Sequence, residues 1–232
     1  MSEAERGQQH QDHREQERHG HAHPVFDRAY WEDRYGRPGR AWSGRPIAAL
    51  VAETAHLPPG RALDVGSGEG GDALWLAARG WQVTGVDISR NALDKAAASA
   101  REREDVDPER LTWQQADLTV WSPPRASVDL VTAHFMHLPL VDRERLFPAL
   151  AEGVAPGGTL LVVGHDADAL PTGAGRHGDP GMLFTVDEVV GRLPPEAWRV
   201  EVAEVRPRTM TTPDGAKVDV ADVIVRATRR AG

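Results

Sequence analysis

The feature that most limits how this chain can fold is a glycine-rich stretch over residues 64–71, Asp-Val-Gly-Ser-Gly-Glu-Gly-Gly. It lies between an apolar run typical of a strand and a helical pattern. Glycines at such a turn let the backbone bend sharply and let a ligand approach without interference from Cβ atoms. A helix beginning near Gly70 directs its free N–H groups toward that ligand. The stretch therefore predicts a ligand-binding turn between strand and helix.

Strand-like and helix-like segments alternate on both sides of this turn. Apolar residues at helical spacing over 47–55 end at a Pro-Pro-Gly stop, and Ser89 is a suitable N-cap for a helix over 90–103. A further helix over 146–154 contains Pro148, which must kink it or lie in its first turn. This alternation is the βαβ pattern of a parallel sheet. The predicted strands cover residues 62–65, 82–87, 111–116, 128–133 and 159–164.

The C-terminal part follows a different pattern. Residues 167–184 are rich in glycine and proline, and a segment of this length is either a lid or substrate loop or an irregular connection. A helix is predicted over 185–193. Alternating residues over 198–202 and apolar residues over 218–227 indicate two more strands. Since Pro-Asp-Gly at 213–215 supplies a turn between them, we expect antiparallel neighbours.

The length of 232 residues suits one α/β domain with a buried core and is short for two. Residues 1–24 carry five of the ten histidines without apolar periodicity, so we expect a disordered His-rich tail and one domain over 25–232. Whether the tail binds a metal stays open, and no metal site is predicted within the domain. Aromatic residues concentrated over 26–46, called the cover segment below, need a partner and are expected to pack over the domain.

Composition restricts the possible partners. Hydrophobic residues make up 40% of the chain and no apolar run approaches the roughly 20 residues of a membrane span, so no membrane partner is expected. The tail lacks the apolar centre of a secretory signal, which favours the cytoplasm. A formal charge of −8 argues against a nucleic-acid partner. Because cysteine is absent, disulfides, thiolate metal sites and cysteine nucleophiles are excluded.

Acidic residues at strand ends separate two classes of ligand. The glycine stretch also fits the G-x-G-x-x-G of dinucleotide-dependent oxidoreductases, which stay an alternative. Asp64 places a negative charge two residues before Gly66, which is unfavourable beside a pyrophosphate and suitable beside the amino group and sulfonium of S-adenosylmethionine. Asp87 ends the second strand 21 residues after Gly66, within reach of ribose hydroxyls, and Asp117 ends the third strand beside the same crevice.

Several segments together resemble the successive motifs of class I S-adenosylmethionine-dependent methyltransferases. The resemblance spans about residues 47–165 and implies a Rossmann-like, doubly wound, mostly parallel seven-stranded sheet with an antiparallel last strand and helices on both faces. A closer resemblance, to the branch of tellurite-resistance and thiopurine-type methyltransferases, rests on Tyr-Trp-Glu-Asp-Arg-Tyr at 30–35 and Trp-Ser-Gly-Arg-Pro at 42–46. The motif segments are residues 63–72, 86–89, 115–118, 128–131 and 155–158.

The resemblance implies S-adenosylmethionine as the cofactor and gives each motif a role. The glycines of the loop line the methionine end of the donor, Asp87 holds the ribose, Asp117 with Leu118 meets the adenine, and the segment 42–46 lies across the cofactor. The cofactor-binding residues implied in this way are Trp42, Arg45, Asp64, Gly66, Ser67, Gly68, Gly70, Asp87, Ile88, Asp117, Leu118 and His134.

Methyl transfer is an in-line displacement on an activated sulfonium, so orientation and exclusion of water supply most of the catalysis. Thiol, selenol or reduced tellurium acceptors need little help from a base, whereas an alcohol, phenol or amine benefits from one. The candidates for that base are His134, after the fourth strand, and His165, after the fifth.

The sequence thus predicts an enzyme that methylates a small molecule on an O, N, S, Se or Te atom. It leaves open the acceptor, the use of a base, and whether the protein is a monomer or a homodimer. The alternative function is a nucleotide- or metal-binding protein that has a methyltransferase-like fold and transfers no methyl group.

Overall fold

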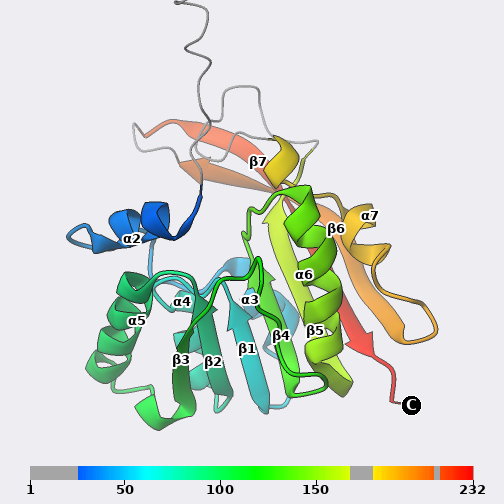
Figure 1. Cartoon of the computed structure of the whole chain (residues 1–232), viewed down its shortest axis with the longest axis horizontal. Helices are drawn as coiled ribbons and strands as arrows, with labels where there is room; N and C mark the ends of the chain where they lie inside the picture. The colour runs from blue at the N-terminus through cyan, green and yellow to red at the C-terminus, as the bar shows by residue number, and fades with distance from the viewer. Residues whose placement is uncertain (1–25, 168–179, 212–214, 232) are drawn as a thin grey trace, which may run out of the picture.

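A seven-stranded sheet runs through the computed structural model, which describes residues 26–167, 180–211 and 215–231 (Figure 1). The strand order is β3-β2-β1-β4-β5-β7-β6. Neighbours from β3 to β5 are parallel, whereas β7 is antiparallel to both β5 and β6. This arrangement confirms the predicted Rossmann-like sheet with its antiparallel last strand. The strands are β1 (Arg61–Val65), β2 (Gln82–Asp87), β3 (Leu111–Gln115), β4 (Val128–His134), β5 (Val154–His165), β6 (Trp198–Thr211) and β7 (Lys217–Arg229).

Helices cover both faces of the sheet, as the alternation of the strand residues requires. Leu160 and Val162 of β5 belong to a buried cluster with α6 and α7, whereas Leu161 and Val163 belong to a second cluster with α3, α4 and α5. Successive side chains of a strand point to opposite faces, so a strand buried on both sides reads as a continuous apolar run. The helices are α2 (Arg28–Gly36), α3 (Ala48–Thr54), α4 (Gly71–Ala77), α5 (Arg90–Glu102), α6 (Leu140–Gly153) and α7 (Val186–Val190).

Three local features differ from the expectation. The cover segment contains a helix, α2, that the aromatic composition alone did not predict. Pro148 lies inside α6, so the first-turn alternative is wrong; burial of Leu146 and Leu150 on the same helix offsets the lost backbone hydrogen bond. The Pro-Gly-Gly at 156–158 lies within β5, where the pairing with β4 shifts register, so that strand starts earlier than predicted.

The hairpin of β6 and β7 is longer than the strand beside it. Pairing of β7 with β5 ends at His165 and Asp222, whereas β6 and β7 continue to pair with each other as far as Thr211 and Lys217. The hairpin therefore projects past the carboxyl end of β5, on the side of the sheet edge where ligands of α/β folds bind (Figure 1).

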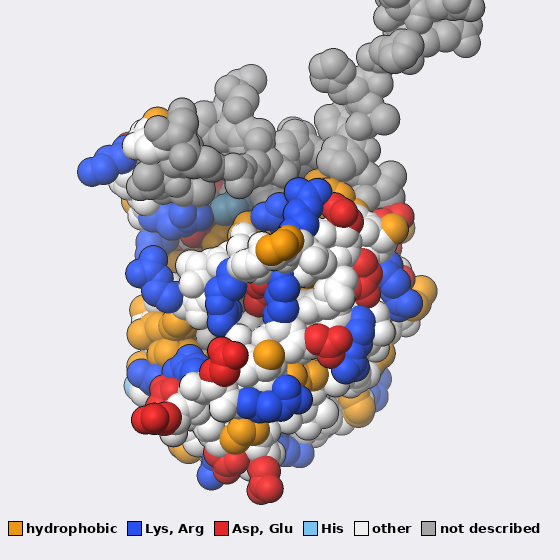
Figure 2. All heavy atoms as spheres, turned by 90° about the vertical axis from the view of Figure 1, so that its left-hand side faces the viewer, with side chains coloured by type: hydrophobic (Ala, Val, Ile, Leu, Met, Phe, Trp, Pro, Cys, Tyr) orange, Lys and Arg blue, Asp and Glu red, His pale blue; other side chains and the backbone are white. Residues whose placement is uncertain are grey.

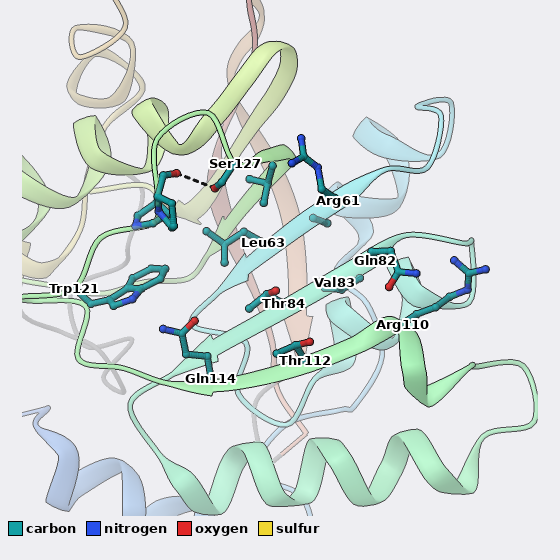
Figure 3. A pocket seen from close by; sticks show the side chains of 14 residues that line it. Arg61, Leu63, Gln82, Val83, Thr84, Arg110, Thr112, Gln114, Trp121 and Ser127 are labelled. Carbon is teal, nitrogen blue, oxygen red and sulfur yellow. Dashed lines mark hydrogen bonds between the residues drawn. The ribbon is translucent and has the colours of Figure 1, made fainter.

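The connection from β3 to β4 over residues 116–127 contains no helix, and this leaves part of one sheet face open. A hollow of about 350 Å³ lies there, between Arg61, Thr84, Gln114 and Trp121 (Figure 3). The lining of the hollow comes from the amino-terminal halves of β1 and β2, from β3 and from this connection. It includes none of the predicted site residues. The hollow is thus separate from the glycine loop.

The predictions for the amino-terminal tail and for the segment 167–184 concern residues that the structure describes only in part. The His-rich tail over 1–24 and most of the segment 167–184 lie outside them. Of that segment, Pro180–Met182 forms a short 3-10 helix and Asp166 bridges to Phe184. Within the described ranges, no helix combines the length and the apolar character needed to cross a membrane.

Arg143 joins three elements and is expected to be important for stability. Its buried guanidinium pairs with Glu188 of α7 at 2.9 Å and donates to the carbonyl oxygens of Leu138 and Gly181. Arg143→Met should lower the free energy of unfolding by about 3–5 kcal/mol in urea titrations, because Glu188 loses its partner in a mostly buried position. The control is Arg125→Met, whose exposed pair with Glu152 should contribute less than about 1 kcal/mol. Equal losses for both variants would contradict this role of Arg143.

Candidate active site

The glycine loop leaves β1 with its backbone held in conformations that suit glycine. Gly66, Gly68 and Gly70 have φ angles of 70°, 52° and 80°. The amides of Gly66 and Ser67 donate to the carbonyl oxygen of Val86 on the next strand, at 2.8 and 3.0 Å. The loop is therefore tied to β2 through its backbone.

Asp87, at the end of β2, also holds the glycine loop in place. One carboxylate oxygen accepts a hydrogen bond from the amide of Gly68 at 2.8 Å, and the other accepts from the amide of Ser89 at 2.9 Å. Burial raises the pKa of Asp87 above its usual value, although these amides act in the opposite direction. Since a carboxylate oxygen has two lone pairs, both oxygens can still accept a hydroxyl hydrogen bond.

The helix α2 is attached to the start of α5 through one carboxylate. Glu32 accepts hydrogen bonds from the hydroxyl of Ser89 at 2.8 Å and from the amides of Arg90 and Asn91 at 2.8 and 3.0 Å. Burial opposes ionisation of Glu32, but the hydrogen bonds outweigh it and lower its pKa. The carboxylate thereby caps the amino end of α5 and holds α2 beside Asp87.

Removal of that carboxylate should loosen the cover. In Glu32→Ala we expect faster amide hydrogen exchange over residues 28–36, because up to three hydrogen bonds to a charged group are lost. Each such bond contributes about 1.5–3 kcal/mol when it is shielded from water, and less at this partly exposed position. The matched control on the same helix is Asp33→Ala, which removes only an exposed pair with Arg37. Unchanged exchange in Glu32→Ala would show that other contacts hold α2.

Tyr35 brings α2 directly onto the glycine loop. Its hydroxyl accepts a hydrogen bond from the indole of Trp42 at 2.9 Å, and a Cβ added to Gly68 would lie 2.9 Å from it. Burial and the charge of Asp87 raise the pKa of Tyr35, so the phenol stays protonated and can donate. Tyr35 was not among the predicted site residues, although it belongs to the motif at 30–35 on which the closer resemblance rests.

Residues 41–45 lie against the glycine loop, and the position across a cofactor that the resemblance implies for residues 42–46 stays a prediction. The buried carboxylate of Glu69 accepts from the amides of Ala41 and Trp42, at 2.9 and 3.2 Å. The Trp42 ring is half exposed, and the guanidinium of Arg34 lies 4.5 Å from its centroid. Arg45 contributes backbone here, since its carbonyl oxygen would lie 3.0 Å from a Cβ at Gly71. Contact of either side chain with a cofactor stays a prediction.

A buried polar cluster lies under the loop, where β1, α4 and β4 meet. The Nδ1 of His134 lies 2.8 Å from one carboxylate oxygen of Asp72, whose other oxygen accepts from the amide of Ile47. Asp64 accepts from the hydroxyl of Thr132 at 2.9 Å through one oxygen. Ligand atoms of Asp64, Asp72 and His134 lie within 4.8 Å of one another, and the short Asp72–His134 contact marks a hydrogen-bonded cluster.

Three polar atoms of this region are buried and find no hydrogen-bond partner among the described residues. They are Oδ2 of Asp64, Nε2 of His134 and the hydroxyl oxygen of Ser67. Burial and the nearby Asp72 raise the pKa of Asp64 to about 7, with His134 acting in the opposite direction. Unsatisfied buried groups are costly in a native protein unless a ligand satisfies them. The group that fits here is a hydrogen-bond donor with a positive charge.

The remaining predicted residues lie at the ends of β2 and β3. The amide of Ala116 donates to the carbonyl oxygen of Asp87, so the two strand ends are adjacent. The carboxylate of Asp117 accepts from the amide and hydroxyl of Thr119, at 2.9 and 2.7 Å, and thus stabilises a local turn. Ile88 and Leu118 are partly exposed beside it. Their contact with an adenine stays a prediction.

A second group of polar side chains lies at the ends of β4, β5 and β7. The Nδ1 of His165 is 3.0 Å from a carboxylate oxygen of Asp222, and the other oxygen accepts from Arg208 at 2.5 Å. The ring of His165 stacks on that of His137 at 5.1 Å and lies 4.8 Å from that of Phe135. His134 and His165 therefore belong to different clusters. Asp222 was not predicted, because no local motif distinguishes it.

Comparisons with known proteins agree with this geometry. Residues 62–158 match the family model described as a methyltransferase domain. The chain is 36% identical over 121 residues to trans-aconitate 2-methyltransferase of Rhizobium meliloti, covering 51% of this chain and 43% of that one. It is 31% identical over 186 residues to the enzyme of the same name from Klebsiella pneumoniae, covering 76% and 64%. The chain thus spans about half to two thirds of the length of these curated relatives.

The fold is also similar to that of a solved structure. TehB from Haemophilus influenzae superposes with a TM-score of 0.64 at 16% identity, covering 88% of this chain and 66% of that one. This likeness shows the fold and is compatible with the tellurite-resistance branch, which stays a prediction. The sheet order, the glycine loop, the matched family model and these relatives together support one family, the class I S-adenosylmethionine-dependent methyltransferases.

Proposed function

We propose that this protein transfers the methyl group of S-adenosylmethionine to a small-molecule acceptor. The observation that carries the proposal is the buried Oδ2 of Asp64. This oxygen lacks a hydrogen-bond partner among the described residues, and Asp64 stands two residues before Gly66, where the glycine loop begins. A cationic ligand with an N–H group satisfies that oxygen, and the methionine end of the donor has both features. The hydride-transfer alternative lacks this match, since a pyrophosphate is anionic.

The other residues fit the rest of the donor. The exposed Gly66 and the absence of a Cβ at Gly68 give room for the methionine portion, and Asp87 offers carboxylate oxygens to ribose hydroxyls. The hydroxyl of Tyr35 points at the same part of the loop from above. The bound donor supplies a methyl group activated by its sulfonium, so the residues of the chain have to orient it, exclude water and admit an acceptor.

A small acceptor is supported by the relatives, whose names specify trans-aconitate. Acidic and basic side chains are interspersed on the face beside α2 and α5, without the broad basic area that a nucleic-acid partner requires (Figure 2). A cytoplasmic location stays part of the proposal.

Calorimetric titration tests the proposal. We expect micromolar binding of S-adenosylmethionine and S-adenosylhomocysteine and no binding of NAD to the same protein. Binding of NAD alone would favour the oxidoreductase alternative. If none of the three binds, the fold serves another purpose and the proposal fails.

A further inference from the structure

We propose that His165 is the base that removes the proton of a hydroxyl acceptor, and that Asp222 and Arg208 are positioning residues that act through it. The proposal rests on the proposed function and adds the chemical class of the acceptor, an alcohol or a phenol. It is carried by the contacts of one polar cluster at the carboxyl end of β5.

The sheet itself fixes the geometry of this pair. His165 is the last residue of β5 and lies directly opposite Asp222 of β7 in the antiparallel register. Residues opposite each other share a face of the sheet, so the 3.0 Å contact between Nδ1 and the carboxylate follows from strand pairing. The pair needs no loop to hold it.

The hydrogen bonds of Asp222 select one tautomer of the imidazole. Burial disfavours the charged carboxylate, but hydrogen bonds from His165 and Arg208 outweigh it and lower the pKa of Asp222. A carboxylate accepts only, so Nδ1 of His165 carries the proton and Nε2 is left as a proton acceptor. Because Arg208 already balances the charge of Asp222, a neutral imidazole is compatible with the pair. The other titratable neighbour is His137, stacked on the ring.

The pair lies next to the donor site along a short stretch of chain. Residues 135–137 run from the glycine loop, where the sulfur of Met136 would lie 3.1 Å from a Cβ at Gly66, to the ring of His165. Phe135 is held at a φ of 52°, which is strained for a residue with a side chain, and its amide donates to Val163 at 2.7 Å. The ring of His165 therefore lies beside the segment that contacts the glycine loop.

His134 is better suited to the donor than to the acceptor. Its side chain is 5% exposed, against 17% for His165, and its Nδ1 contacts Asp72 inside the cluster that contains Asp64. A base must meet the incoming acceptor, so the more exposed histidine fits that role.

The chemistry of the base determines the acceptor class. The acceptor oxygen forms its bond to the methyl carbon, the carbon–sulfur bond breaks with its electron pair remaining on sulfur, and the hydroxyl proton moves to Nε2 of His165. Asp222 stabilises the resulting imidazolium, which then releases the proton to water. A phenol has a pKa of about 10, so it is almost entirely protonated at neutral pH and benefits from such a base. A carboxylate acceptor is already ionised and needs none.

Nitrogen NMR of the imidazole tests the arrangement without an acceptor. The full chain is first shown to bind S-adenosylhomocysteine by calorimetry, and the signals of His165 are assigned from their loss in His165→Gln. In this complex we expect the Nδ1–H tautomer between pH 7 and 8.5, and its loss in Asp222→Asn. The Nε2–H tautomer, or an imidazolium throughout that range, would overturn the proposal. Failure to bind the homocysteine compound would instead overturn the proposed function.

Methylation of phenol and of 4-nitrophenol at pH 8.5 then tests the role of the base. We expect His165→Gln to slow transfer to phenol by about 10²–10⁴-fold with donor affinity unchanged, and to slow transfer to the more acidic 4-nitrophenol much less. Equal losses for both phenols would indicate a structural role and overturn the proposal, as would a wild-type enzyme that methylates trans-aconitate and neither phenol. If the wild-type enzyme methylates none of these compounds, the tautomer observed by NMR decides whether the proposal stands.

Discussion

Asp64→Asn is expected to weaken binding of S-adenosylmethionine by about 30-fold or more, a larger minimum loss of donor affinity than is expected for Asp87→Ala. Loss of one partner of a buried, hydrogen-bonded charge pair costs about 2–5 kcal/mol. The asparagine keeps the size of the side chain and removes the charge below the glycine loop. Calorimetry measures the loss, and Thr132→Val is the control, since it removes only a neutral hydrogen bond to Asp64. Equal affinities of Asp64→Asn and wild type would show that the cationic end binds elsewhere.

The pH dependence gives a second readout of the same residue. The pKa of Asp64 in the free protein is raised to about 7, so the carboxylate is ionised above that pH and protonated below it. Donor affinity of the wild type should therefore fall as the pH drops from 8 to 6, and Asp64→Asn should lack this dependence. Because the pKa of Asp64 is higher in the folded than in the unfolded protein, protonation of Asp64 favours the folded state. This stabilisation is fully present below the unfolded pKa and is lost as the pH rises through 7. Asp64→Asn should accordingly be no less stable than wild type at pH 8.

Asp87→Ala is expected to weaken donor binding by about 10- to 150-fold, which corresponds to about 1.5–3 kcal/mol for hydrogen bonds to a charged group. The substitution removes the proposed ribose contact and also leaves the amides of Gly68 and Ser89 without their acceptor. The two effects are separated by comparing S-adenosylhomocysteine with its 2′-deoxy analogue. Wild type should prefer the hydroxylated compound, and the variant should bind both alike. A preference retained in Asp87→Ala would place the ribose away from this carboxylate.

The parts of the fold that were predictable are those with local signals. Apolar runs next to glycine and proline stops located β1 to β4 and the carboxyl half of β5, and Ser89 was correctly identified as the N-cap of α5, where its hydroxyl accepts from the amide of Ala92. Such patterns depend on residues that are close in the sequence. The glycine loop and Asp87 were found for the same reason.

The parts that were missed depend on contacts between distant segments. The partnership of His165 with Asp222 follows from the register of β5 and β7, and a slip of one residue would turn Asp222 to the other face. Likewise, nothing near Glu32 in the sequence shows that it caps a helix that begins at residue 90. Residues of this kind are located by pairing and packing, which the sequence pattern alone does not specify.

The way in which α2 is fastened determines how a ligand can reach the loop beneath it. Among the described residues, α2 is joined to the rest of the domain mainly by hydrogen bonds, such as those that Glu32 accepts at the start of α5, whereas the sheet is held by two large apolar clusters. Water can replace hydrogen bonds of this kind at small net cost, but it cannot replace buried apolar contacts. Detachment of the helix therefore requires far less free energy than disruption of the sheet, and exchange of spent donor for fresh can proceed with the core intact.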